Sequence, residues 1–147
     1  MTDQAIQAGI IRCVGCGKKN RVPVAASGSP RCGSCGKPLP WIVDAGDQSF
    51  AEIVERAGLP VLVDFWAPWC GPCRMVSPAL EQIAGDLAGR IKLVKVNVDS
   101  APALQRRFGI QSIPTLMLFR GGQVAASQIG AAPADRLRTW IDQVLAR

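Results

Sequence analysis

Six cysteines are the residues of this sequence whose type and spacing point most directly to chemistry. They form three C-x-x-C pairs, which are Cys13 with Cys16, Cys32 with Cys35, and Cys70 with Cys73. This spacing serves either tetrahedral metal binding or thiol–disulfide exchange. The sequence contains no histidine, which excludes Ser-His-Asp and Cys-His catalysis, Cys-His zinc fingers and haem held by histidine. Any metal must therefore bind to thiolates or carboxylates.

The first two pairs form a C-x2-C-x15-C-x2-C pattern, which falls within the spacing range of four-cysteine zinc sites. A glycine follows each pair and can turn backbone amides toward a sulfur. Four thiolates leave zinc no open coordination position, so we expect one structural zinc ion that supplies folding free energy to this short segment. The expected ligands are Cys13, Cys16, Cys32 and Cys35. Iron fits the same cage, and two disulfides or four free thiols are further alternatives.

The excess positive charge lies in the same front segment. The chain of 147 residues has 17 Lys and Arg against 11 Asp and Glu, and residues 1–40 carry +5 of the net +6. A zinc ion with four thiolates would offset part of that charge, so we expect solvated basic loops and no nucleic-acid binding. The N-terminus does not read as a secretory signal, and no apolar run is long enough for a membrane span. We therefore expect a cytoplasmic protein with reduced thiols.

The third pair has different surroundings, because it lies between a buried-strand pattern and a helix pattern. A helix N-terminus stabilises an anion, so Cys70 is predicted to be an exposed nucleophile of low pKa. Cys73, one turn inside the helix, is predicted to be buried and to act as the resolving thiol. A metal-binding pair or a structural disulfide is the alternative.

Hydrophobic periodicity predicts the elements that position this pair. Residues 1–40 are expected to form a zinc-binding module and residues 41–147 an α/β domain with a central mixed sheet flanked by helices. Runs that are apolar on both faces suit central strands covered by helices. Strands are predicted at 39–43, 61–67, 91–98, 115–120 and 123–129, and helices at 47–57, 70–87, 101–108 and 134–145.

The motif Trp66-Ala-Pro-Trp-Cys-Gly-Pro-Cys-Arg74 resembles the active-site motif of the thioredoxin family, and the similarity extends over about residues 44–145. With the four-cysteine module, the whole chain resembles the bacterial zinc-containing class of that family, thioredoxin 2. The resemblance implies a thioredoxin-like fold with a small zinc-ribbon-like module, and a protein-disulfide reductase that works through Cys70 and Cys73. Its other parts are Val63-Asp64-Phe65-Trp66, Lys95-Val-Asn-Val-Asp99, Ile113-Pro114-Thr115, Phe119-Arg-Gly-Gly122 and Ile129-Gly130.

Two charged residues are expected beneath the pair. Asp64 lies in a predicted central strand, where a carboxylate is costly to bury, so a raised pKa would suit it to take or give the proton of Cys73. The resemblance assigns the matching residue this proton-relay role, and an Asp that meets water at a strand edge is the alternative. The resemblance also implies that Lys95 lies near Asp64, although a snorkelling surface lysine fits the pattern almost as well.

Further residues are expected to meet the substrate. The resemblance implies that the Ile113–Pro114 bond is cis and faces the redox pair, whereas the sequence alone favours a trans bond. A cis bond would expose the backbone of Ile113 to an extended substrate strand. Between the cysteines, Gly71 and Pro72 match the reducing members of the family. The expected apolar rim around Cys70 comprises Trp69, Ile113, Ile129 and Gly130, beside Pro114.

The implied partners are an NADPH-dependent, flavin-containing thioredoxin reductase and oxidised protein substrates. We expect this chain itself to bind no flavin or nicotinamide and to be a monomer. Three other hypotheses stay open. These are an oxidant or isomerase, a zinc-dependent binding module that carries the redox domain as a passenger, and a front module that senses oxidation by releasing its metal.

Overall fold

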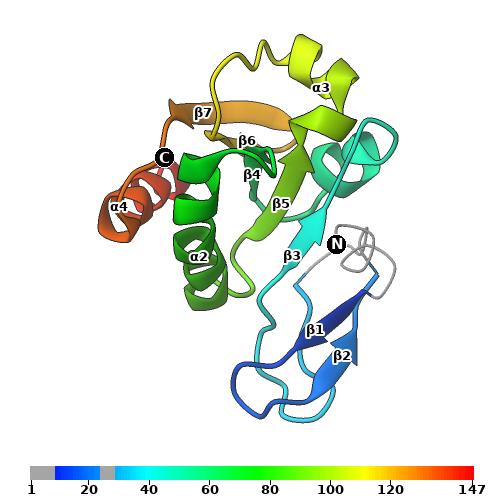
Figure 1. The fold of residues 1–147 in the computed structure, drawn as a ribbon. Helices are drawn as coiled ribbons and strands as arrows, with labels where there is room; N and C mark the ends of the chain where they lie inside the picture. The colour runs from blue at the N-terminus through cyan, green and yellow to red at the C-terminus, as the bar shows by residue number, and fades with distance from the viewer. Residues whose placement is uncertain (1–8, 24–28) are drawn as a thin grey trace.

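The computed structural model describes residues 9–23 and 29–147, which contain two separate β-sheets. In the smaller sheet, β1 (Ile10–Arg12) pairs antiparallel with β2 (Lys19–Arg21). The larger sheet has five strands in the order β3-β5-β4-β6-β7 (Figure 1). The pairs β3–β5 and β5–β4 are parallel, whereas β4–β6 and β6–β7 are antiparallel. The predicted α/β class with a mixed sheet is therefore confirmed.

The strands of the larger sheet are β3 (Ile42–Asp44), β4 (Val61–Trp66), β5 (Lys92–Asn97), β6 (Thr115–Arg120) and β7 (Gln123–Ile129). The helices are α2 (Gly71–Asp86), α3 (Pro102–Arg107) and α4 (Ala134–Leu145), with a short π-helix η1 (Ala51–Glu55) and a 3-10 turn η2 (Val98–Ser100). In the part of the chain that the structure describes, no helix is both long and apolar enough to cross a membrane.

Two expectations for the secondary structure were wrong, and two short strands were not predicted. The strand predicted at 39–43 begins only at Ile42, because the backbone amide of Leu39 donates to the Pro30 carbonyl and so belongs to the front segment. The helix predicted at 47–57 shortens to the π-helix η1, in which the Arg56 amide donates to the Ala51 carbonyl. The strands β1 and β2 were not predicted, because their three-residue sequences have no apolar alternation.

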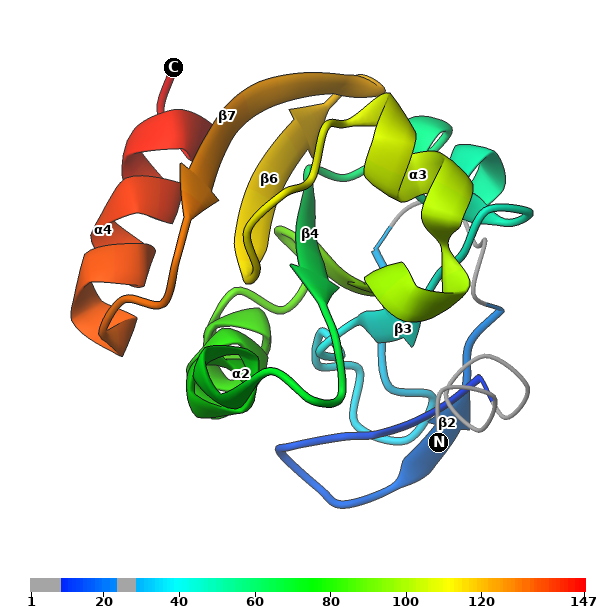
Figure 2. The same cartoon turned by 45° about the horizontal axis from the view of Figure 1, so that its top comes forward.

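Helices cover both faces of the larger sheet, as Figure 2 shows. On one face, α2 and α4 pack through Leu80 and Ile141 against strand residues that include Leu62 and Leu93. On the other face, η1 and α3 pack against residues that include Val63 of β4. Because neighbouring residues of a strand point to opposite faces, this arrangement buries residues 61–65 of β4 without a break. β4 is thus a central strand, and it leads directly to the start of α2.

The front segment lies at the end of the molecule where α2 ends (Figure 1). The Ser29 hydroxyl donates to the Gly89 carbonyl at 2.7 Å, and Leu39 is buried in the same apolar cluster as Trp41. Since α2 has 16 residues, its two ends lie about 24 Å apart. The four cysteines and the Cys70–Cys73 pair therefore lie at opposite ends of this helix.

Lys92 is a buried cation, and its burial was not predicted from the apolar strand pattern around it. Its side chain is 1% exposed, and its ammonium donates to the Ile53 carbonyl at 2.9 Å and lies 4.2 Å from the centre of the Trp41 ring. Burial lowers the pKa of Lys92 to about 8. The contacts fasten η1 and the start of the larger domain to β5.

We predict that Leu80→Ala lowers the free energy of unfolding by about 2–5 kcal/mol, because the side chain is fully buried between α2 and the sheet. Gln82→Ala, at an exposed position of the same helix, is the matched control and should change it by less than about 0.5 kcal/mol. Urea unfolding followed by circular dichroism measures both. Equal effects of the two substitutions would contradict the packing described for α2.

Candidate redox site and four-cysteine cluster

Cys70 and Cys73 lie where the central strand β4 passes into α2. Cys70 is the N-cap residue of the helix, and the backbone amide of Cys73 donates to its Sγ at 3.2 Å. The two sulfurs form a disulfide. Pro72 occupies the first turn of α2, where a backbone amide has no acceptor within the helix, so the lack of an amide hydrogen costs no helical hydrogen bond. When the disulfide is reduced, the free amides and the dipole of this helix end favour a thiolate at Cys70.

Cys70 is less exposed than we expected. Its residue is only 4% exposed and Cys73 2%, so the prediction of an exposed Cys70 was wrong and that of a buried Cys73 is confirmed. The Ile113 carbonyl oxygen lies 3.8 Å from the Cys70 Sγ. That carbonyl belongs to a loop 43 residues away in sequence, and local sequence patterns give no measure of such a distant contact.

The Ile113–Pro114 peptide bond is cis, as the resemblance implied. The Gly130 amide donates to the Pro114 carbonyl at 2.8 Å and so ties the end of β7 to this loop. Ile113 and Gly130 are half-buried, whereas Ile129 is 69% exposed. The structure thus brings the remote rim residues to one side of the disulfide.

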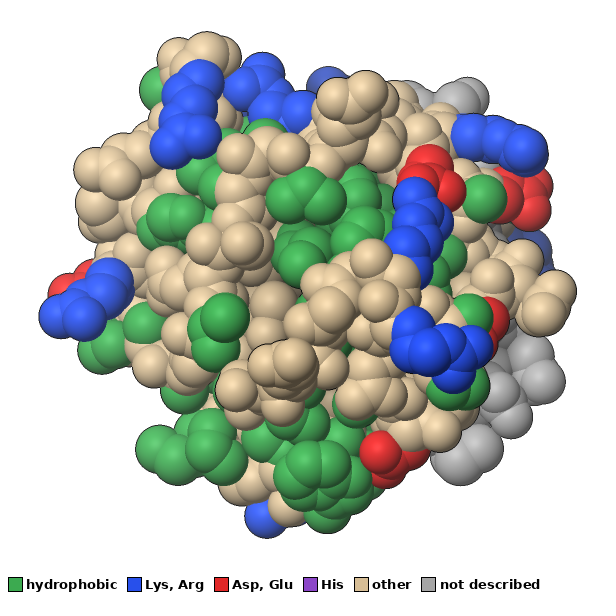
Figure 3. Space-filling model, turned by 90° about the horizontal axis from the view of Figure 1, so that it is seen from above, with side chains coloured by type: hydrophobic (Ala, Val, Ile, Leu, Met, Phe, Trp, Pro, Cys, Tyr) green, Lys and Arg blue, Asp and Glu red, His purple; other side chains and the backbone are tan. Residues whose placement is uncertain are grey.

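Trp69 completes the apolar rim with 68% of its surface exposed. Its indole N–H donates to the Asp99 carboxylate at 3.0 Å, a contact that holds the ring at the surface. Sequence reasoning gave Asp99 no role, although the residue lies in one of the quoted motifs. Figure 3, which views the molecule from above, shows apolar side chains gathered in patches with Lys and Arg mainly toward the margin.

Asp64 lies fully buried beneath the pair. Both of its carboxylate oxygens lack a hydrogen-bond partner among the described residues, and it pairs in register with Lys95 on the neighbouring strand. Burial raises the pKa of Asp64 to about 7, while the charge of Lys95 lowers it and that of Glu81 raises it. The carboxyl therefore exchanges its proton near neutral pH.

A cavity of about 60 Å³ connects this carboxyl with Cys73 of the redox pair. The expected proximity of Lys95 to Asp64 is confirmed, and the lysine side chain is 18% exposed. The lining residues are Asp64, Trp66, Cys73, Arg74, Ser77 and Lys95. Cys73 thus shares a small polar space with a carboxyl that titrates near pH 7. This is the arrangement needed to move a proton to or from its sulfur.

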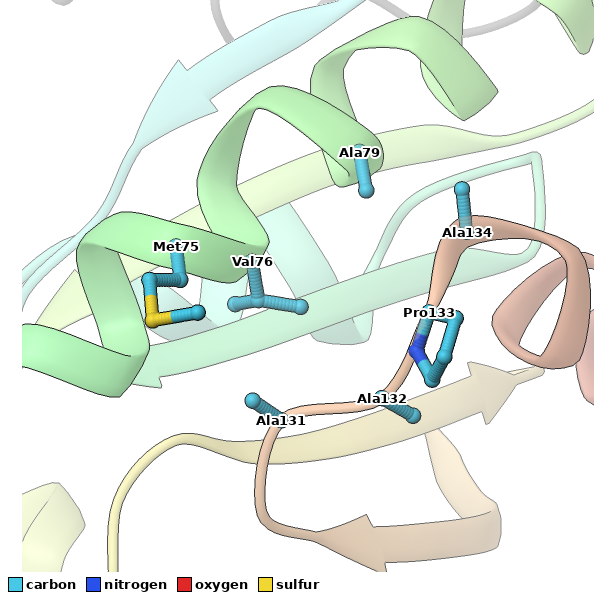
Figure 4. A pocket seen from close by; sticks show the side chains of 7 residues that line it. All are labelled: Met75, Val76, Ala79, Ala131, Ala132, Pro133 and Ala134. Carbon is cyan, nitrogen blue, oxygen red and sulfur yellow. The ribbon is translucent and has the colours of Figure 1, made fainter.

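A larger pocket of about 340 Å³ lies between α2 and the loop that follows β7 (Figure 4). Met75 and Val76 line it from the helix, and Ala131 and Ala132 from the loop. Every lining side chain is apolar, so this pocket offers no acid, base or nucleophile. Of the two, only the smaller cavity is lined by a cysteine of the redox pair, Cys73.

The four front cysteines form a single cluster, in which all Sγ atoms lie within 4.8 Å of one another. The Cys13–Cys35 and Cys16–Cys32 sulfur pairs are each 3.6 Å apart. A tetrahedron with Zn–S bonds of about 2.3 Å has sulfur–sulfur edges of about 3.8 Å. The cluster therefore fits one tetrahedral metal ion.

The two halves of this cluster repeat the same backbone structure. Gly17 and Gly36 both have φ of 77°, in the left-handed region, and each donates its amide to the first cysteine of its pair at 2.9 Å. Backbone amides also face the sulfurs. The amides of Cys35 and Ser34 lower the pKa of the Cys32 thiol to about 6, despite its burial. Such thiols bind metals as thiolates.

Sequence reasoning missed two arginines that support the cluster. Arg12 and Arg31 each precede the first cysteine of a pair, and each donates to the carbonyl of the following glycine, Gly17 or Gly36, at 3.1 Å. The signal was present as the repeated pattern R-C-x-x-C-G-K. Each arginine closes its own cysteine loop.

Comparison with known proteins finds a match over most of the chain. The family model described as thioredoxin matches residues 41–143. Thioredoxin of Haemophilus influenzae is 46% identical over 102 residues, which cover 69% of this chain and 95% of the relative. Thioredoxin 1 of a Nostoc species is 50% identical over 99 residues (67% and 92%), and thioredoxin of Allochromatium vinosum 48% over 101 residues (69% and 94%).

The family match begins at residue 41, after the four-cysteine segment. From residue 41 onward, the matching sequence contains both the Cys70–Cys73 disulfide and the five-stranded sheet that positions it. The chain therefore belongs to the thioredoxin family of protein-disulfide oxidoreductases.

Proposed function

We propose that this protein is a zinc-containing disulfide reductase of the thioredoxin 2 class, which accepts electrons from an NADPH-dependent thioredoxin reductase and reduces disulfides in other proteins. The observation that carries the proposal is the placement of Cys70 at the N-terminus of α2, with Cys73 beside the buried carboxyl of Asp64. Gly71 and Pro72 between the cysteines are the pair found in reducing members. The oxidised chain is then the product of turnover.

The first chemical step is attack by the Cys70 thiolate on one sulfur of a substrate disulfide. A mixed disulfide forms, and the other substrate sulfur leaves as a thiolate that takes a proton from water. Asp64 then removes the proton of Cys73 within the shared cavity, and the Cys73 thiolate attacks the Cys70 sulfur. The second substrate thiolate leaves, and the Cys70–Cys73 disulfide remains. Two electrons have passed from the dithiol to the substrate.

The cis-proline loop and the apolar rim suit extended segments of protein. The Ile113 backbone beside the Cys70 sulfur offers hydrogen bonds to a substrate strand, which would align its disulfide for attack. The exposed side chains of Trp69 and Ile129 add sequence-tolerant apolar contact, and the half-buried Gly130 follows Ile129 in the chain. This surface explains how one site would serve many substrates.

We assign residues 1–40 to a structural zinc module and residues 41–147 to the thioredoxin domain. Zinc bound by four thiolates has no open position for catalysis and contributes folding free energy. Zinc is preferred to iron on abundance. The cluster needs a compartment that keeps its four thiols reduced, and the cytoplasm meets that need.

Substitution of the two redox cysteines should have different outcomes. Cys70→Ser is expected to abolish insulin reduction, because the attacking sulfur is lost. Cys73→Ser should keep the first attack but accumulate a mixed disulfide with the substrate, which non-reducing electrophoresis and mass spectrometry detect. Reduction of insulin by Cys70→Ser at the wild-type rate would contradict the assignment of the nucleophile.

The direction of electron flow is tested by the reduction potential of the full, metal-loaded chain. We expect a value near about −270 mV against a glutathione or dithiothreitol series, the range of a reductant. A value between about −180 and −120 mV would instead identify an isomerase or oxidant.

Metal analysis tests the front cluster. We expect about one zinc per chain, because four thiolates complete a single tetrahedral site. Cys16→Ser should lose most of this zinc, whereas Cys70→Ser should retain it and serves as the matched control. Retention of stoichiometric zinc by Cys16→Ser, or its loss from Cys70→Ser, would contradict the assignment. Iron in place of zinc would be visible in the same elemental analysis.

Asp64→Asn should remove the pH dependence of the resolving step. In the wild type this step is expected to slow as pH falls through about 7, where burial has placed the pKa of Asp64. The variant has no base at this position and should resolve a mixed disulfide about 100-fold more slowly at pH 8. Rapid-quench kinetics from pH 5.5 to 9 measure the effect. An unchanged midpoint in the variant would exclude Asp64 as the relay.

The same variant provides a check through stability. The folded pKa of Asp64 lies above its ordinary value of 3.8, so the folded state binds more protons between about pH 4 and 7. The unfolding free energy of the wild type should therefore fall as pH rises across this interval. Asp64→Asn should lack this decline and be more stable than the wild type above pH 7.

A further inference from the structure

Three residues on one stripe of α2 face the buried carboxyl and its neighbouring lysine. Cys73, Ser77 and Glu81 follow each other at intervals of four residues, so they lie on the same side of the helix. Asp64 and Lys95 are register partners on the parallel strands β4 and β5 and therefore point to the same face of the sheet. α2 covers this face.

The ammonium of Lys95 is held by the helix. It donates to the Ser77 hydroxyl at 2.7 Å and to the Glu81 carboxylate at 3.4 Å. The Ser77 hydroxyl in turn donates to Glu81 at 3.2 Å. Both oxygens of Asp64 lack a hydrogen-bond partner among the described residues, although this carboxyl lines the same cavity as Ser77 and Lys95. The lysine is thus near Asp64 in space but bonded to other groups.

We propose that Ser77 and Glu81 are positioning residues for disulfide exchange, which hold the Lys95 ammonium on the helix side of the cavity and leave the Asp64 carboxyl unpaired beside Cys73. This inference rests on the proposed proton relay and extends it to two residues that do not touch the reacting sulfurs. Ser77 is the closer of the two to Lys95, and it lines the cavity itself. Glu81 is half exposed and links the group to solvent.

The physical reason lies in the strength of a direct ion pair inside the protein. An ammonium bonded to a buried carboxylate strongly favours its charged form, which makes the carboxylate a weak base. A lysine held by a neutral hydroxyl and a second carboxylate exerts a smaller influence on Asp64. The arrangement thus keeps the proton of Asp64 exchangeable near neutral pH while a cation remains close.

Other charged groups around Asp64 do not replace this arrangement. From α2, Arg74 also lines the cavity, but its guanidinium donates to the Pro68 carbonyl at 2.7 Å. From β3, Asp44 is the register neighbour of Lys95 on the side away from Asp64. From β6, Leu116 faces Asp64 with an apolar side chain. Ser77 and Glu81 are therefore the helix groups whose removal redirects the ammonium.

The test uses the full, metal-loaded chain and follows the resolving step between pH 5.5 and 9. Ser77→Ala and Glu81→Gln are each expected to move the midpoint of the pH profile downward by about 1 unit, because the freed ammonium turns to Asp64. Ser77→Thr retains the hydroxyl and should restore the wild-type midpoint. Asp86→Asn removes an exposed carboxylate farther along α2, 3.8 Å from Arg138, and should leave the midpoint unchanged.

Carbon-13 NMR of the Asp64 carboxyl provides a second readout that a merely structural role would not move. Its titration should shift downward in Ser77→Ala and Glu81→Gln together with the kinetic midpoint. Unchanged or raised midpoints in both variants would overturn the proposal. If Asp64→Asn removes the pH dependence while these variants do not shift it, the relay stands and the positioning role fails. If Asp64→Asn keeps the wild-type pH dependence, the relay itself fails.

Discussion

The burial of Asp64 in the central strand is the constraint on which the redox half of this structure depends. A carboxylate without hydrogen-bond partners is costly in an apolar core, and most strands avoid it. Here the buried carboxyl lies beneath the start of α2 and lines one cavity with Cys73, where the proposed relay would move a proton to and from the sulfur. The two helix-covered faces of the sheet provide the low-dielectric surroundings, and they do so because β4 is buried along both faces. The burial of β4 on both faces therefore both defines the fold and creates the surroundings for the proposed proton chemistry.

The chain also shows that a C-x-x-C pair takes its chemistry from its backbone. Around Cys70 the backbone enters a helix, so free amides meet a single sulfur and the pair cycles between dithiol and disulfide. Around Cys13 and Cys32 the backbone turns back through a left-handed glycine, and two such loops bring four sulfurs together. In the front cluster, backbone amides lower the pKa of the Cys32 thiol, and at the helix start free amides favour a thiolate at Cys70. The difference is the number of sulfurs that share one space.

Sequence patterns predicted most of the fold because its strands are apolar and its helices amphipathic. The bounds of β6, β7 and α4 agree with the sequence expectation, and the redox motif was located by its place between a strand and a helix. The strands β1 and β2 were missed because the geometry of the cysteine loops, not hydrophobicity, brings them together. Lys92 and the contacts of Ser77 were missed for another reason. These contacts depend on which distant segments of the chain pack against a side chain, and local hydrophobic periodicity does not predict that.

The placement of the two cysteine sites at opposite ends of α2 limits how they can influence each other. A separation of about 24 Å along the helix prevents direct thiol exchange between the clusters of one chain. The remaining route is through shared packing, since Leu39 of the front segment and Trp41 at the start of the larger domain lie in one apolar cluster with Cys70. A metal ion bound by the four front cysteines, as proposed, would thereby stabilise the same core that supports the redox pair. Coupling between the sites is thus a matter of folding free energy, transmitted without any shared chemistry.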